Sequence, residues 1–155
     1  MIPAYTKHRR SSSGHRYWRV RCPTTYESGN YMACAELAMH ATIGGSNMLT
    51  PSSTMTASAT ISGYPTSNAV DGNPSTFWTT GGTAPPSGGH WLACDFGSGA
   101  AVTVAEVVYT VRPDTYREDP ASLYVDYSDN GTTWTNAWSV SSIPSWTAGQ
   151  TRTFS

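Results

Sequence analysis

The sequence predicts a single all-β domain, and three observations support this class. The chain has 155 residues, a length at which one hydrophobic core forms without cross-links. Only 12% of the residues are charged, whereas glycine (14 residues) and proline (10 residues) are frequent. Several short stretches alternate between apolar and polar residues and are separated by turn-forming residues. This combination is typical of many short strands joined by turns, as in a β-sandwich.

The first 14 residues differ from the rest of the chain. Six of the nine basic residues lie within the first 21 positions, and residues 1–14 have too little apolar periodicity to form a core. We therefore predict a flexible basic arm over residues 1–14 and one domain over residues 15–155. The arm is either simply solvated or attaches the domain to an acidic partner surface or to nucleic acid. The net charge of −1 argues against a protein that coats nucleic acid.

The first strand is expected at residues 15–22, because Trp18, Val20 and Cys22 fall on one face and their neighbours on the other. Residues 32–40 are ambiguous. They contain good helix formers, but they have no helical cap, and their alternation allows a strand with Glu36 on the polar face.

Further strands are expected near residues 55–61, 77–79, 91–96, 102–111, 123–128, 133–140 and 151–154. Residues 102–111 are apolar on both faces, as in a central strand. Residues 123–128 alternate regularly, and Asp129-Asn130-Gly131 then predicts a tight hairpin turn into Trp134. Among the tryptophans, Trp18, Trp134 and Trp138 are expected in the core, and Trp146, between a proline and a glycine, is expected to be exposed.

The three cysteines, Cys22, Cys34 and Cys94, form an odd number with no CxxC pair, so they are expected to be buried apolar residues. The sequence shows no signal peptide and no membrane-spanning apolar run, and it begins with Met1. We expect a complete chain that matures in a reducing cytosol.

No arrangement typical of catalysis is found, since GxSxG and HExxH motifs are absent. His90 and Cys94 share a face of one strand, but that spacing separates them by ~13 Å, too far to bind one metal ion. An enzyme is therefore not expected.

Two loops carry candidate binding residues. Residues 68–78 combine Asp71, Gly72 and Thr76 before two aromatic residues, which suits either a hard cation such as calcium or an Asx-turn that caps its own backbone. Residues 112–120 combine Arg112, Tyr116 and Arg117, and they can either bind a sugar through exposed donors and a ring or form a salt-bridged connection.

Residues 68–78 resemble the A-x-D-G-x-x-x-T-x-W signature of the discoidin, or coagulation-factor type C, family, which includes family-32 carbohydrate-binding modules and fucose-binding lectins. Tyr17-Trp18-Arg19-Val20 and Ala35-Glu36-Leu37 resemble the RYWRL and IAELEL segments that close the domain in this family. The resemblance implies a galactose-binding-like jelly-roll β-sandwich, with strands at residues 32–40. It also implies a calcium ion held by Asn68, Asp71, Asn73, Thr76 and Glu36.

The closing segment comes first in this chain, which indicates a circularly permuted order or a slice from an array of such domains. Loop arginines bind the sugar in related modules, so the resemblance implies a binding role for Arg112 and Arg117. The other candidate ligand residues are Tyr64, His90, Tyr116 and Trp146.

The sequence is also similar to discoidin-like domains of bacteriophage structural proteins. The resulting hypothesis is a calcium-stabilised virion component, assembled in the host cytoplasm, that recognises a host-surface glycan and contacts other virion proteins through the arm. The alternative is a structural virion protein, such as a capsid decoration or tail-attachment component. Homo-oligomers fit either hypothesis. Membrane insertion is not expected, because the loops lack the apolar spikes that it requires.

Overall fold

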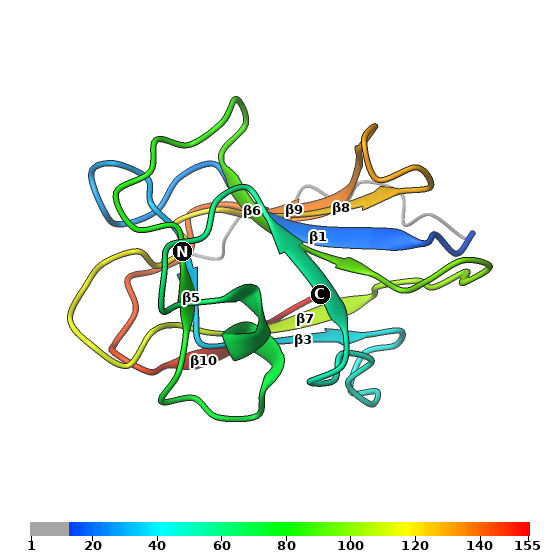
Figure 1. Ribbon diagram of the computed structural model, residues 1–155, viewed down its shortest axis with the longest axis horizontal. Coiled ribbons are helices and arrows are strands. Elements are labelled where there is room, and N and C mark those ends of the chain that lie inside the picture. The colour runs from blue at the N-terminus through cyan, green and yellow to red at the C-terminus, as the bar shows by residue number, and fades with distance from the viewer. Residues whose placement is uncertain (1–12) are drawn as a thin grey trace.

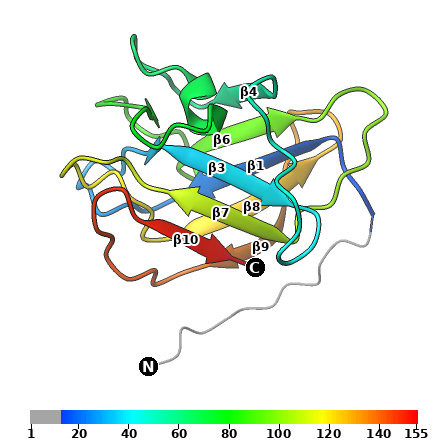
Figure 2. The ribbon, with the colours of Figure 1, turned by 90° about the horizontal axis from the view of Figure 1, so that it is seen from below.

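The computed structural model describes residues 13–155 and shows two antiparallel sheets packed face to face (Figure 1, Figure 2). The larger sheet has the strand order β4 (Thr54–Ala57), β6 (His90–Asp95), β1 (Tyr17–Cys22), β8 (Leu123–Ser128) and β9 (Thr135–Val140). The smaller has the order β10 (Thr151–Phe154), β7 (Glu106–Thr110) and β3 (Glu36–His40). A short pair, β2 (Ala33–Cys34) and β5 (Trp78–Thr79), and one 3₁₀ helix, η1 (Thr66–Val70), complete the described chain. The predicted all-β jelly-roll class is confirmed.

The core lies between the two sheets and follows from the alternation of side chains along each strand. In β1, Trp18, Val20 and Cys22 are buried while the residues between them are partly exposed. Facing them, Leu37 of β3 and Tyr109 of β7 are almost completely buried. All three cysteines are free and buried, as the sequence predicted.

The segment expected to close the domain does so within this chain. β1 pairs with β6 on one side and β8 on the other, with Val20 opposite both Leu92 and Val125. β3 pairs with β7, with Leu37 opposite Tyr109. The first part of the chain therefore supplies a central strand of one sheet and an edge strand of the other.

Several elements differ from the expected boundaries. Residues 32–40 do not form one strand. β2 ends just before Ala35 and β3 begins just after it, because β2 pairs with β5 whereas β3 pairs with β7. β4 ends at Ala57, and β7 begins only at Glu106. The turn between β8 and β9 covers residues 129–134 and is longer than predicted, since Ser128 and Asn130 side chains organise it. Residues 1–12 of the predicted arm lie outside the described residues.

The loops at the end of the sandwich near β5 (left in Figure 1) gather segments that are far apart in the sequence. They connect β1 to β2, β5 to β6 and β7 to β8, and the region around η1 lies beside them. Within residues 13–155, no helix has the length and apolar character needed to cross a membrane.

Candidate functional site

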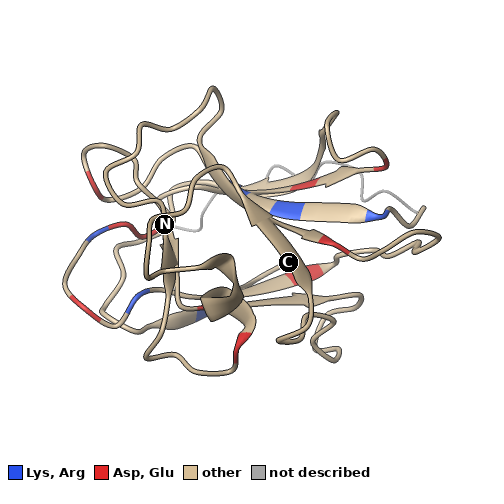
Figure 3. Ribbon diagram, in the orientation of Figure 1, with Lys and Arg blue, Asp and Glu red and all other residues tan. Residues whose placement is uncertain are grey.

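Four of these loop segments surround a pocket of about 460 Å³. This volume falls within the roughly 300–1,000 Å³ range of small-molecule sites. Residues of both charge signs occur in these loops (Figure 3). The lining residues are Glu27, Tyr31, Ile61, Tyr64, Thr79, Gly81, Gly82, Arg112, Asp114, Tyr116 and Glu118.

Three tyrosines from three different loops provide the aromatic part of the pocket. Tyr116 is 64% exposed and Tyr64 is 37% exposed, while Tyr31 is partly buried. Tyr64 packs on Phe77, with ring centroids 4.7 Å apart. The rings are therefore supported from behind and accessible from the pocket, as binding of the apolar face of a sugar requires.

Gly81 shapes the opposite wall. Its φ of +52° lies in the left-handed region, and a Cβ there would stand only 2.9 Å from Cγ2 of Ile61. Glycine therefore lets the loop after β5 pack closely on Ile61.

Arg112 lies beneath the tyrosines and is only 7% exposed, so the expectation that it is an exposed donor was wrong. Its guanidinium pairs with Asp114, with Nη2 2.7 Å from Oδ2, and with Glu118, which is itself buried. It also lies over the rings of Phe77 (4.2 Å to the centroid) and Tyr116 (4.7 Å). Burial lowers the pKa of Arg112, but Asp114 and Glu118 outweigh this effect and raise it overall. Arg112 therefore positions the pocket, in agreement with the salt-bridged interpretation.

Glu118 links two walls of the pocket. Its Oε2 accepts a hydrogen bond from the Thr79 hydroxyl at 2.7 Å and also pairs with Arg112. The neighbouring Asp119 faces away from the pocket lining and is 5% exposed. Burial raises the pKa of Asp119 to about 6, although the nearby arginines oppose the shift.

The other predicted ligand residues are not gathered in this pocket. Arg117 lies over the ring of Tyr26, 5.1 Å from its centroid, outside the pocket lining. His90 has no exposed surface, and it binds Ser58 and the carbonyl of Thr83. His90 therefore acts on the pocket only indirectly, by holding the loop that follows β5.

The predicted exposure of Trp146 was wrong, because this residue is 6% exposed. Its Nε1 donates a hydrogen bond to the carbonyl of Pro120 at 2.7 Å, and its ring packs near Tyr109 and Phe154. Trp134 was expected in the core but is partly exposed, whereas Trp18 and Trp138 are buried as predicted.

Glu27 and Tyr31 were not predicted as pocket residues. They lie in the loop between β1 and β2, which carries no recognisable motif. The one local signal was the turn-forming pair Gly29-Asn30 just before Tyr31, and in the structure Asn30 has a positive φ of 54°.

A second polar cluster lies where η1 meets β3. Asp71 accepts hydrogen bonds from the Asn73 amide at 2.8 Å and from the Thr76 hydroxyl at 2.7 Å, so the predicted Asx-turn is present. Thr76 also donates to the Asn73 carbonyl at 2.8 Å. The Asn68 side chain instead donates to the carbonyl of Phe77 at 3.0 Å. The loop thus concentrates oxygen atoms around Asp71.

Glu36, at the start of β3, faces this loop. Burial and then the carboxylate of Asp71 raise the pKa of Glu36 to about 7, while the amides of Asn73 and Gly72 oppose the shift. One of its oxygens, Oε1, is buried without a hydrogen-bond partner among residues 13–155. Among residues 13–155, no group of three or more His, Cys, Asp and Glu side chains is placed so that it could hold one metal ion. Two carboxylates beside amide, hydroxyl and carbonyl oxygens nevertheless match the donors that a hard cation prefers.

An all-β sandwich with a pocket built from end loops defines the class of small ligand-binding β-sandwich domains. Residues 54–155 match the F5/8 type C domain family, and the chain belongs to this family, as its sequence predicted. Residues 13–53, which supply β1, β2 and β3, lie outside the match.

The chain is also similar to a sialidase from Micromonospora viridifaciens, with 37% identity over 68 residues. The similarity covers 44% of this chain and 10% of the sialidase, so the chain spans about a tenth of the length of that protein. No solved structure matches the chain significantly.

Proposed function

We propose that this protein is a non-catalytic carbohydrate-binding module whose end-loop pocket binds a neutral sugar. The pocket carries this proposal, because it places accessible tyrosines beside carboxylates. An aromatic ring stacks on the apolar face of a sugar, and carboxylates accept strong hydrogen bonds from its hydroxyl groups. Tyr116 and Tyr64 would stack on the sugar, and Asp114 would accept from its hydroxyls.

The charge of the pocket selects among sugars. Glu27, Asp114 and Glu118 contribute three carboxylates, and Arg112 contributes one guanidinium. This excess of negative charge repels sugars that carry a carboxylate or sulfate. It does not repel uncharged hexoses. The pocket is therefore proposed to prefer neutral hexoses over acidic sugars.

The comparison supports a glycan-directed role. The matched relative is named as a sialidase, an enzyme that acts on sialylated glycans. The similarity covers only 10% of that enzyme, which is too little to carry its reaction to this chain. A binding module fits both the short match and the F5/8 type C family.

We also propose that calcium stabilises the domain at the second cluster. Glu36 and Asp71 would supply carboxylates, and Asn73, Thr76 and Asn68 further oxygens. A bound cation would remove the repulsion between the two carboxylates and satisfy the unpaired oxygen of Glu36. It would act structurally, by linking β3 to the loop after η1.

The resemblance to phage structural proteins supports a finer proposal, in which the module recognises a host-surface glycan from a virion and attaches through residues 1–14. Deleting residues 1–13 should leave the sandwich folded, since β1 begins at Tyr17. If the truncated protein is still incorporated into particles, the proposed role of the arm is wrong.

A glycan array followed by calorimetric titration tests the pocket. Tyr116→Ala and Tyr64→Ala should each weaken binding of the best neutral glycan about tenfold, since an aromatic platform contributes roughly 1–2 kcal/mol. Ile43→Ala is the matched control, because Ile43 is 60% exposed in the loop after β3, away from the pocket. If no glycan binds, the structural alternative is favoured; if both tyrosine variants bind like the parent, the glycan is not bound by this pocket.

A further inference from the structure

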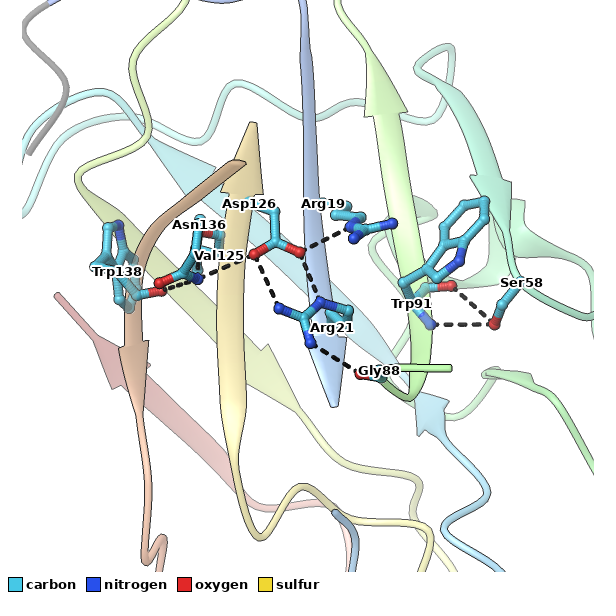
Figure 4. A network of polar contacts seen from close by, with 9 residues as sticks. All are labelled: Arg19, Arg21, Ser58, Gly88, Trp91, Val125, Asp126, Asn136 and Trp138. Atoms are coloured by element: carbon cyan, nitrogen blue, oxygen red, sulfur yellow. Dashed lines mark hydrogen bonds and ion pairs between the residues drawn. The ribbon is translucent and has the colours of Figure 1, made fainter. Parts of the chain in front are cut away.

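The outer face of the five-stranded sheet carries an unusual group of side chains, shown in part in Figure 4. Alternation along β1 directs Arg19 and Arg21 away from the core, while Trp18 and Val20 point inward. The rings of Trp91 of β6 and Trp134, just before β9, lie next to each other and both contact the guanidinium of Arg19. We call Arg19, Trp91 and Trp134 the sheet-face cluster.

Two guanidinium groups share one carboxylate on this face. Asp126 is 2% exposed, and it accepts hydrogen bonds from Nε of Arg19 at 2.9 Å and from Nε of Arg21 at 2.7 Å. Asn136 adds a third donor at 3.0 Å. The terminal nitrogens of Arg21 also donate hydrogen bonds, one to Asp126 and one to the carbonyl of Gly88. The pairing leaves one positive charge without a matching carboxylate.

That unmatched charge is located at Arg19. Its two terminal nitrogens have no hydrogen-bond acceptor within residues 13–155, and its side chain is 13% exposed. The guanidinium carbon lies 4.3 Å from the ring centroid of Trp134 and 5.7 Å from that of Trp91. The two indole rings are themselves 6.5 Å apart, and both are partly exposed. Two donors without an acceptor in the described chain therefore lie beside two partly exposed indole rings.

The residues beside Arg19 on the neighbouring strands β6 and β4 have short side chains. Ala93 of β6 is its direct neighbour across the pair, and Thr56 of β4 is the next residue along the same row. Neither side chain is long enough to project over the guanidinium. A planar carboxylate that reaches the terminal nitrogens of Arg19 through its exposed part can form two parallel hydrogen bonds, the geometry that arginine favours.

We propose that the sheet-face cluster is a second binding site, which takes the carboxylate-bearing sugar residue of an acidic polysaccharide. The carboxylate would pair with the terminal nitrogens of Arg19, and the sugar ring would stack on Trp134 or Trp91. A sheet face is open along its length, so it can hold a residue inside a chain as well as one at its end. The end-loop pocket has the opposite charge preference, and the two sites rest on separate observations.

Single-stranded nucleic acid also combines negative charge with stacking rings. Its binding, however, relies on a groove with many cations along the phosphate backbone. Here Arg21 is committed to Asp126, and Arg16 is paired with Asp95 at 2.7 Å. One available guanidinium favours a single carboxylate over a run of phosphates.

The test uses hexagalacturonate and its methyl ester, which keeps the ring and removes the charge. Tryptophan fluorescence of the unmutated protein should titrate with the acid and not with the ester, and binding should weaken as salt is raised. Arg19→Gln and Trp134→Ala should each weaken binding about tenfold or more, the loss expected for one charged hydrogen bond or one stacked ring. Tyr116→Ala, in the end-loop pocket, should bind hexagalacturonate like the parent.

Arg19→Gln keeps Arg21 and Asn136 on Asp126, and melting curves should show that it folds. Equal affinity for the acid and the ester would overturn the proposal, as would no binding of either. So would normal hexagalacturonate binding by Arg19→Gln and Trp134→Ala. If a single-stranded oligonucleotide binds to the parent and not to Arg19→Gln, and hexagalacturonate does not bind, the ligand of this site is nucleic acid and not an acidic sugar. Failure of neutral glycans to bind the end-loop pocket would leave this result unaffected.

Discussion

The carboxyl group of Glu36 on β3 lies against that of Asp71 in the loop after η1, and each changes the ionisation of the other. Asp71 has hydrogen-bond donors for both of its oxygens, whereas Oε1 of Glu36 has none within the described part of the chain. Two carboxylates this close repel each other when both are ionised. The proposed cation would therefore relieve this repulsion at the junction between strand and loop.

Calcium should raise the melting temperature of the protein relative to chelator. A ligand that binds only the folded state stabilises it by about 2.7 kcal/mol at a hundredfold excess over Kd. Glu36→Gln should abolish this calcium response, and without calcium it should melt at or above the temperature of the parent, because it removes the repulsion between Glu36 and Asp71. The measurement is differential scanning calorimetry with calcium and with chelator.

Asp129→Asn is the matched control for calcium, since the Asp129 side chain is 72% exposed. It should keep the full calcium response. Identical melting curves of the parent with calcium and with chelator would remove the proposed ion.

The sequence was most informative where local pattern and tertiary environment agree. Alternation placed β8 at Leu123–Ser128 without error, because Leu123 and Val125 are buried in the core and Tyr127 packs against it. The family signature at residues 68–78 depends on turn chemistry, and Asp71 forms that turn through its own neighbours. Such features are encoded within a few residues.

Features that depend on distant partners could not be predicted. Trp146 sits between turn-forming residues, yet the carbonyl of Pro120 and the ring of Tyr109 bury it. Arg112 is buried because Thr79, on β5, holds Glu118 in place beside it. No spacing within residues 112–120 indicates the contact between Glu118 and Thr79. The sequence therefore predicted an exposed arginine at a position where the structure has a buried one.

Arg112→Gln should destabilise the protein by about 3–5 kcal/mol, because it leaves the buried carboxylate of Glu118 without its charged partner. Urea denaturation measures this change. Arg117→Gln is the matched control and should cost about 1 kcal/mol or less, since its side chain is 49% exposed and lies 4.0 Å from Asp119. Equal effects of the two substitutions would mean that Arg112 is not the positioning residue of the pocket.

Asp126→Asn should also cost about 3–5 kcal/mol, because Arg19 and Arg21 would lose the charge that they share. Burial opposes ionisation of Asp126, but the hydrogen bonds from Arg21, Asn136 and Arg19 outweigh it and lower the pKa. Asp95→Asn is the comparison, since Asp95 pairs with Arg16 at a more exposed position and should cost about 1 kcal/mol. A small loss for Asp126→Asn would show that the two arginines find other partners.

Mild acid should weaken the protein through His90. Burial lowers the pKa of His90 below its ordinary value of 6.5, although the Thr83 carbonyl and Glu118 oppose the shift. The folded state therefore binds fewer protons at this side chain than the unfolded state does. The contribution of His90 to the free energy of unfolding should be constant above about pH 6.5 and should fall as the pH drops below it.

The hydrogen bonds of His90 explain why its protonation is unfavourable in the folded protein. Nε2 of His90 faces the carbonyl of Thr83 at 2.9 Å, so it carries the hydrogen, and Nδ1 is left to accept from the Ser58 hydroxyl at 2.8 Å. A second proton on Nδ1 would break this arrangement and leave a cation with no exposed surface. Because Thr83 belongs to the loop that carries Gly81 and Gly82, acid should loosen the pocket wall as well.

His90→Gln separates this effect from other titrating groups, because glutamine keeps a donor for Thr83 and does not ionise. Urea denaturation of both proteins at pH 8, 6.5 and 5 should show the difference in unfolding free energy shrinking as the pH falls, since only the parent loses stability through this group. Affinity for the best neutral glycan should fall with acid in the parent more than in the variant. If the two proteins lose stability in parallel below pH 6.5, His90 is not the group responsible, and the acid response must arise elsewhere in the sandwich.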